Sequence, residues 1–422
     1  MPPTCSTNTM LNLRRPDPPP MQQNAASPIQ RVPADVLGCI FEAALESNHW
    51  YLHDRGEYRM ASSDYHTRAI LPPIIVQVCR SWHNVACRMA SLWRFILLNL
   101  QATPQSIRMA EVFICRSRNA ELAVEFWLPE NSRDMPKVNS EMATILVQNA
   151  HRIRALYIGV ASECYTALPS FRASLVQLHT LKFYGRGSAS REWIEFLAGL
   201  PVNSVGMSLW RVPSSPHEIH SFMGLSTLAI SVDLQHNVDE SHRLHLPHIT
   251  TLTLECSGSE FDPHHIFDAL SAPSLTTLTV VALHNATTVS DWLGRHTQLS
   301  TLRVVGAKIK AAQVAQIMRA APRLQEFVFR RGLPHSILDG LLAEMSLTNA
   351  TPLLPQLRHL TIDGWYMFTS EALVKMLESR ADSLSHIELV FSPGRMLDPT
   401  LLARVQALRI PTLLEEQKNK YR

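Results

Sequence analysis

Two six-residue stretches, LTTLTV at 275–280 and LSTLRV at 299–304, place apolar side chains at the same first, fourth and sixth positions. Their first leucines, Leu275 and Leu299, are 24 residues apart. Alternating apolar residues over such a length are typical of a strand with one buried face. Because unrelated strands rarely return at a fixed interval, the spacing predicts a repeat architecture.

The same pattern occurs ten times, with successive first positions 25, 24, 23, 24, 26, 24, 25, 33 and 27 residues apart. Helical segments with their own start signals lie between several units, for example at 262–273, 290–297 and 369–381. A unit of strand, turn and helix cannot bury its strand alone, so the units are expected to stack as a parallel sheet with helices outside. The units begin at Ile153, Leu178, Val202, Leu225, Ile249, Leu275, Leu299, Leu324, Leu357 and Leu384.

The segments before the array continue its alternation. Residues 106–118 have helical periodicity and residues 121–128 read as a strand, so together they are interpreted as an atypical capping unit. A doubly wound nucleotide-binding domain also alternates strands and helices, but the glycines of YGRGSAS at 184–190 lack the spacing of a phosphate loop. The fold class predicted is therefore an α/β solenoid.

Composition limits the classes of function. The 422 residues are 46% apolar and 18% charged, which suits one large globular domain or two smaller ones. Lysine and arginine number 39 against 36 aspartates and glutamates, an excess too small to favour a nucleic-acid partner. Seven cysteines without a Cys-x-x-Cys predict a reducing compartment, hence a cytoplasmic or nuclear location. No signal peptide or membrane-spanning run is found, so no membrane partner is expected.

The N-terminal third differs in character from the array. Residues 1–28 contain seven prolines and are predicted to be a disordered tail. Residues 29–100 form a predicted helical module whose two helical patterns, near 33–45 and 73–89, are separated by an insert at 46–71. The second pattern places Val78, Cys79, Trp82 and Val85 on the inward face. Residues 101–412 are assigned to the solenoid and 413–422 to a charged tail.

Two sequence stretches carry a family resemblance. IQRVPADVLGCIFEAAL at 29–45, followed by VCRSWHNVACRMASLWRFILL at 78–98, resembles the F-box-like module of fungal F-box proteins. The array that follows resembles the irregular leucine-rich repeats that often accompany this module. The insert is longer than the usual connection between the two helices, and the repeats lack the asparagine of regular leucine-rich repeats. Other residue types, such as Leu283 and Ala307, stand there, so less regular curvature is expected.

The resemblance implies a role in protein degradation. F-box proteins are the substrate-receptor subunits of SCF-type cullin–RING ubiquitin ligases, in which the helices dock on a Skp-type adaptor and the repeats hold a target protein. No cofactor and no catalysis on this subunit are then expected. The alternative is a non-catalytic leucine-rich-repeat scaffold with no link to ubiquitin. The expected apolar contacts of the module, divided between adaptor and fold, are Val32, Pro33, Val36, Leu37, Ile40, Phe41, Cys79, Trp82 and Val85.

Residues with catalytic or metal-binding chemistry are present but poorly arranged. Cys79 with His83 one helical turn away does not by itself make a nucleophile and base, and a packed cysteine is favoured. The series His242, His245 and His248 is interrupted by Pro247 and has no closing ligand, so no metal site is predicted. The protein is therefore not expected to be an enzyme.

A target surface is predicted on the open face of the last repeats. In the apolar pattern the third, fifth and seventh residues point away from the core. Threonine fills the third position in most of the middle units, which suits a structural strand position, whereas charged residues and histidines replace it after Thr301. Ordinary charges that pair with one another are the competing interpretation. The predicted target contacts are Arg303, Glu326, Arg330, His359, Asp363, His386 and Glu388.

Overall fold

The computed structural model describes residues 32–53, 71–99, 104–127, 140–159, 174–184, 200–209, 224–232, 244–256, 267–268, 270–332, 337–364, 368–391, 399–408 and 410–416. The predicted tail at 1–28 and residues 54–70 of the insert lie outside these ranges. The chain divides into two compact units, which are described separately. The first is Met1–Val160 with Pro169–Leu178, and the second is Ala161–Leu168 with His179–Arg422.

The first unit begins with a helical head and continues into a parallel sheet. The head contains α1 (Ala34–His53), a helix at 71–78, α3 (Arg80–Arg88) and the 3-10 helix η2 (Ala90–Trp93). Strands β1 (Phe95–Asn99), β2 (Leu122–Trp127) and β3 (Ile153–Gly159) then pair in parallel order. Between them lie α4 (Pro104–Arg116), α5 (Ser140–Asn149) and η3 (Ala150–Arg152).

Trp93 is the buried residue at the point where the head passes into the sheet. Its side chain is 1% exposed, and its indole Nε1–H donates to the carbonyl of Ala86 at 2.8 Å. The ring of Phe113 on α4 packs edge to face against it, with centroids 5.0 Å apart. The expected boundary at residue 100 therefore falls after β1, a strand that already belongs to the parallel ladder.

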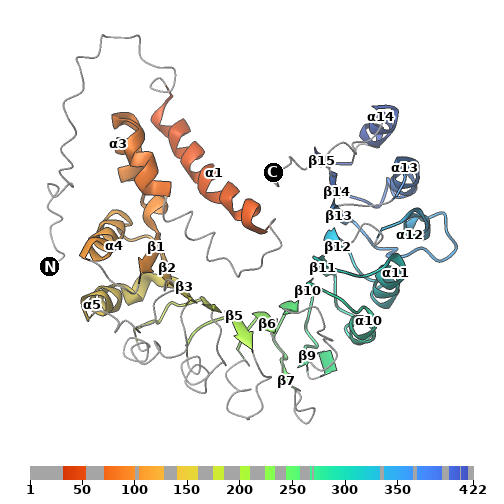
Figure 1. Cartoon of the computed structure of the whole chain (residues 1–422), viewed down its shortest axis with the longest axis horizontal. Helices are drawn as coiled ribbons and strands as arrows, with labels where there is room; N and C mark the ends of the chain where they lie inside the picture. The colour runs from red at the N-terminus through yellow and green to blue at the C-terminus, as the bar shows by residue number, and fades with distance from the viewer. Residues whose placement is uncertain are drawn as a thin grey trace. The chain divides into compact units, whose positions relative to one another are not determined.

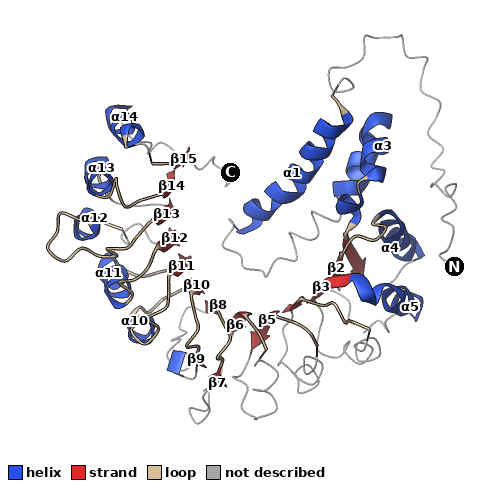
Figure 2. Cartoon of the chain, turned by 180° about the vertical axis from the view of Figure 1, so that it is seen from behind, coloured by secondary structure: helices blue, strands red, loops and turns tan. Residues whose placement is uncertain are grey.

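The second unit is a ladder of parallel strands. Its main sheet runs in the order β4, β5, β6, β8, β10, β11, β12, β13, β14 and β15 (Figures 1 and 2). A short pair, β7 with β9, lies outside this order. The strands are β4 (Thr180–Tyr184), β5 (Ser204–Leu209), β6 (Thr227–Val232), β7 (Leu244–His245), β8 (Thr251–Cys256), β9 (Leu270–Ser271), β10 (Thr277–Val281), β11 (Thr301–Val305), β12 (Glu326–Gly332), β13 (His359–Gly364), β14 (His386–Phe391) and β15 (Thr412–Glu416).

Helices cover one side of the last strands. Figure 1 shows α10 to α14 along the outer side of β10 to β15, as the repeat pattern predicts. Their bounds are α10 (Thr287–Leu293), α11 (Ala311–Ala320), α12 (Asp339–Met345), α13 (Ser370–Ser379) and α14 (Pro399–Ala407). The helix predicted at 262–273 is wrong at its end, because residues 270–271 are extended and pair with β7. Strand β15 likewise extends into the predicted tail at 413–422.

The apolar pattern of the sequence forms the core. The first, fourth and sixth residues of the unit at Leu299, namely Leu299, Leu302 and Val304, are at most 2% exposed. Neighbouring strands pair in the same register, so that the fourth residues of successive units lie side by side: Leu278 beside Leu302, and Leu302 beside Phe327. Because every unit presents its apolar residues at the same register, neighbouring units bury them against one another. This confirms the predicted solenoid.

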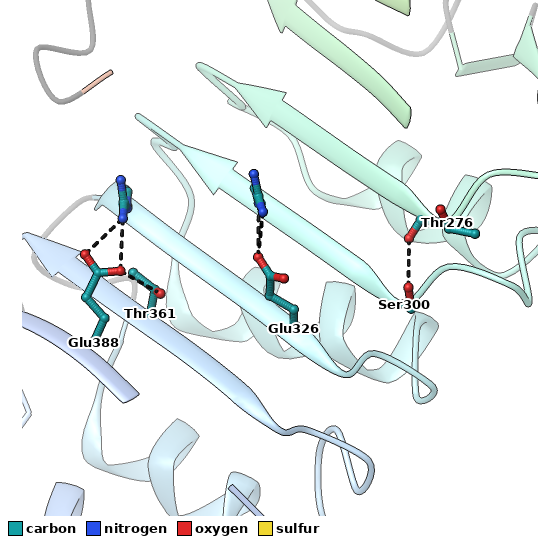
Figure 3. Close-up of polar contacts among 7 residues, drawn as sticks. Thr276, Ser300, Glu326, Thr361 and Glu388 are labelled. Carbon is teal, nitrogen blue, oxygen red and sulfur yellow. Dashed lines mark hydrogen bonds and ion pairs between the residues drawn. The ribbon is translucent and has the colours of Figure 1, made fainter. Parts of the chain in front are cut away.

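Hydroxyl side chains form a ladder along the strand starts that the sequence pattern did not reveal. The hydroxyl of Ser300 donates to the carbonyl of Thr276 at 3.2 Å, as Figure 3 shows, and Thr276 donates to Thr250 at 3.1 Å. Thr250 in turn donates to Ser226 at 3.2 Å. The same carbonyl of Thr276 also accepts two backbone N–H groups, from Ser300 and Thr301. Three donors to one carbonyl thus satisfy the backbone between the starts of β10 and β11.

Candidate functional site

The head divides its apolar residues into a buried set and an exposed set. Leu37, Phe41 and Leu45 recur every four residues along α1 and are 1%, 1% and 5% exposed, respectively. The ring of Phe41 contacts the ring of Trp82 on α3 edge to face, with centroids 5.0 Å apart. The two predicted halves of the module therefore pack together as one small core.

The exposed set consists of two aliphatic pairs with helical spacing. Val36 and Ile40, one turn apart on α1, are 44% and 47% exposed. Ile74 and Val78, one turn apart on the helix at 71–78, are 53% and 50% exposed. Single exposed aliphatic residues are common on protein surfaces, whereas contiguous apolar patches mark sites of contact with another molecule. Among the other predicted adaptor contacts, Pro33 is exposed, and the half-buried ones are Val32, Cys79, Trp82 and Val85.

The second helical pattern of the head was predicted as one helix, and this is wrong at Cys79. The backbone of Cys79 is extended, with φ −160° and ψ 170°, so the helix at 71–78 ends there and α3 begins at Arg80. Because the helix is interrupted at Cys79, residues 71–78 do not share the helical periodicity of residues 80–88. Val78, predicted to point inward, is therefore exposed. Three β-branched residues in succession, at 74–76, also make that stretch a poor helix former.

The ring of His83 is engaged with backbone rather than with Cys79. Its Nδ1 lies 3.2 Å from the carbonyl oxygen of Val76, to which it donates. The backbone N–H of His83 donates to the carbonyl of Cys79 at 2.9 Å. These contacts place His83 as the residue that joins the two short helices, and they give no support to a nucleophile and base at this position.

The strands β11 to β14 bring all seven predicted target contacts onto one sheet. Arg303 on β11 donates from Nε and Nη2 to one oxygen of Glu326 on β12, at 3.1 and 2.9 Å. The pair runs diagonally across the register, since Arg303 lies beside Val328 and Glu326 beside Thr301. Both side chains are partly exposed, so the pair contributes little to stability.

A second ion pair spans three strands. Arg330 on β12 donates from Nη2 to both oxygens of Glu388 on β14, each at 3.0 Å. Thr361, on the intervening strand β13, donates its hydroxyl to the same carboxylate at 3.1 Å (Figure 3). Asp363, the register neighbour of Arg330, is only 2% exposed. The carboxylate of Glu388 is therefore held in place, and Asp363 is not accessible to a partner in this conformation.

Two histidines complete the predicted surface. His359 on β13 and His386 on β14 are register neighbours, and both are exposed. Their rings are nearly perpendicular, at 86°, with centroids 6.2 Å apart. The predicted patch thus consists of two neutralised ion pairs, one buried aspartate and two accessible imidazoles. Pairing of the charges with one another, which the sequence left open, is what the geometry shows for Arg303, Glu326, Arg330 and Glu388.

The described residues meet neither the requirements for a metal site nor those for a membrane-spanning helix. Among the residues described, no group of three or more His, Cys, Asp or Glu side chains is placed to hold a metal ion. His245 lies 3.3 Å from the hydroxyl of Ser271, whereas His242 is outside the described ranges. No helix within those ranges has the length and apolar character needed to cross a membrane.

The regular register of β8 to β14, with a helix following most of these strands, defines the architecture. The chain is a solenoid of α/β repeats, with parallel strands in sequential order and helices between most of them. No protein-family model matches the sequence, and no curated protein matches it.

Among the solved structures that match this chain, at low identity and with TM-scores of 0.40 or less, are two leucine-rich-repeat proteins. The leucine-rich repeat-containing protein LegL7 from Legionella pneumophila is 14% identical, with 74% of this chain and 96% of that chain covered and a TM-score of 0.40. The leucine-rich repeat domain of APL1 is 12% identical, with 76% and 97% covered and a TM-score of 0.26. A protein from Bacteroides fragilis is 13% identical, with 70% of this chain and 64% of that chain covered and a TM-score of 0.32. The chain therefore spans under two thirds of the length of that protein.

Proposed function

We propose that this protein is the substrate receptor of an SCF-type ubiquitin ligase, in which the head binds a Skp-type adaptor and the repeats hold a target protein. The observation that carries the proposal is the division of the α1 side chains. Leu37 and Phe41 build the core of the head, while Val36 and Ile40 stay on its surface. A short helical module with a closed core and an unburied aliphatic stripe is suited to packing against helices of another protein.

The division also assigns separate roles to the residues of the predicted adaptor surface. Val36 and Ile40, with the exposed pair Ile74 and Val78, are the contacts available to an adaptor. Leu37, Phe41 and the ring of Trp82 act through the fold, because they hold α1 on α3. Truncation of Trp82 to alanine would therefore disturb the head itself, whereas changes at the exposed pair leave its core intact.

The experiment is co-purification of the full chain with a Skp-type adaptor after co-expression. In the variant Val36→Asp with Ile40→Asp, two charges replace an apolar stripe, and we expect adaptor recovery to fall to background. Val112→Asp on α4 is the matched control, because Val112 is also a surface valine of the first unit, 38% exposed. It should recover adaptor as the unaltered chain does. Failure of the unaltered chain to recover any adaptor would refute the proposal and leave a scaffold without a link to ubiquitin.

A further inference from the structure

Two columns of side chains change character at the same point of the solenoid. In the second position of the repeat, hydroxyl residues give way to Gln325 and Arg358 in two successive units and return at Ser385. In the third position, threonine gives way to Glu326, His359 and His386. The hydroxyl residues replaced are represented by Ser226, Thr250, Thr276 and Ser300, and the threonines by Thr227, Thr251, Thr277 and Thr301.

The backbone does not require the replacement of hydroxyl residues by Gln325 and Arg358. The N–H groups of Arg358 and His359 donate to the carbonyl of Gln325 at 2.8 and 2.9 Å. This is the same arrangement that Ser300 and Thr301 make with Thr276, so the chain enters the strands identically. The hydroxyl contribution to the ladder is given up at Gln325 and Arg358 and resumes at Ser385, whose hydroxyl donates to the carbonyl of Arg358 at 3.3 Å. In these two units larger polar side chains stand exposed in its place. Such a loss without a structural gain indicates a role in contacting another molecule.

The groups accessible on this part of the surface are mainly hydrogen-bond donors. Arg323 and Arg358 are exposed, and neither guanidinium has an ion pair or hydrogen bond with another residue of the described ranges. The carboxylates of the strand face are occupied instead: Glu326 by Arg303, and Glu388 by Arg330 and Thr361. An incoming partner therefore meets guanidinium and imidazole N–H groups rather than free carboxylates, apart from the exposed Asp382 at the turn before β14.

We propose that these residues form a docking surface for a carboxylate-rich segment of a protein. The surface, here called the strand-start patch, consists of Arg323, Gln325, Arg358, His359 and His386. Guanidinium groups bind carboxylates through charge-assisted hydrogen bonds, and Gln325 and the imidazoles supply further donors. A polypeptide is favoured over a nucleic acid because a peptide can place its carboxylates at positions that avoid the exposed Asp382, whereas a continuous row of phosphates cannot. The inference rests on the proposed role of the repeats as target receptor and names the chemistry of the target.

The test measures binding of a fluorescein-labelled poly-glutamate peptide to the full chain by fluorescence anisotropy at low salt. The variant combines Arg358→Ser, His359→Thr and His386→Thr, which restore the residue types that the chain itself uses at equivalent positions, so the fold should be kept. The affinity for the peptide is expected to fall by about tenfold or more. The matched control is Lys375→Gln on α13, which removes one exposed positive charge outside the patch and should leave the affinity unchanged.

Three outcomes would overturn the inference. The first is no measurable binding of the peptide, and the second is equal loss in the triple variant and the Lys375→Gln control, which would show attraction by overall charge. The third is tighter binding of a single-stranded oligonucleotide that the triple variant also loses, which would assign the patch to nucleic acid. None of these measurements involves the adaptor. The proposed binding of a Skp-type adaptor is therefore tested independently, by the co-purification experiment.

Discussion

Arg380 anchors the one repeat whose length departs most from the others. The unit that begins at Leu324 is 33 residues long, and its additional residues follow α12. Arg380, the residue after α13, is 0% exposed and donates to three backbone carbonyls. They belong to Met345, Leu353 and Leu354, the last at 3.0 Å. One guanidinium thus holds both ends of the additional segment.

The effect of removing it follows from two opposing contributions. A hydrogen bond from a charged group contributes about 1.5–3 kcal/mol, so three such bonds contribute about 6 kcal/mol. Burial lowers the pKa of Arg380 from its ordinary value to about 10, which corresponds to a cost of about 3 kcal/mol for keeping the charge inside. Because the folded pKa lies below the unfolded one, that cost opposes folding at neutral pH. Arg380→Met removes the three hydrogen bonds and also removes the cost of burying the charge. The net destabilisation is therefore about 3 kcal/mol.

Hydrogen exchange is the suitable assay, because a repeat array does not unfold in a single step. In Arg380→Met, amides at 341–357 should exchange about a hundredfold faster, as expected for a local loss of about 3 kcal/mol. Arg380→Lys should be intermediate, since an ammonium cannot reach three carbonyls in the fork geometry of a guanidinium. The control Arg323→Met removes an exposed arginine directly before this repeat and should leave exchange at 341–357 unchanged. Unchanged or slower exchange in Arg380→Met would refute the reasoning, because the desolvation cost would then outweigh the bonds.

Three smaller effects can be measured by hydrogen exchange of the amides around each substituted residue. Gly306→Ala should destabilise by about 1 kcal/mol, because Gly306 has φ +65°, whereas Ala282→Gly, at φ +57°, should not destabilise; equal losses at both would contradict this. Thr276→Val should cost about 0.5–1.5 kcal/mol through its lost bond to Thr250, and a neutral result would remove the hydroxyl ladder as a source of stability. Trp93→Phe keeps a buried ring but removes the indole donor, so that the carbonyl of Ala86 keeps only the N–H of Met89, and about 0.5–1.5 kcal/mol should be lost; full stability would mean that packing alone suffices.

The sequence by itself determined the repeat and its core. Spacing of apolar residues predicted every strand from β3 to β6, β8 and β10 to β14, because burial of an alternating face in a stacked array depends on local periodicity. It also placed α4 and α13 correctly, whereas the helix predicted at 290–297 is shifted, because α10 is Thr287–Leu293. The sequence further located Arg303, Glu326, Arg330, His359, Asp363, His386 and Glu388 on one sheet. These features follow from residue type and position in the repeat.

Only the tertiary structure decided which of those residues are accessible. The pairing of Arg330 with Glu388 crosses β13 and joins residues 58 positions apart, and the burial of Asp363 depends on neighbours from other strands. Likewise the helix break at Cys79, which exposes Val78, reflects packing of two short helices rather than periodicity. Arg380 reads in the sequence as an ordinary charge at a helix end. Its burial is possible because three carbonyls converge on it from α12 and the segment that follows, and such convergence has no signature in a linear pattern.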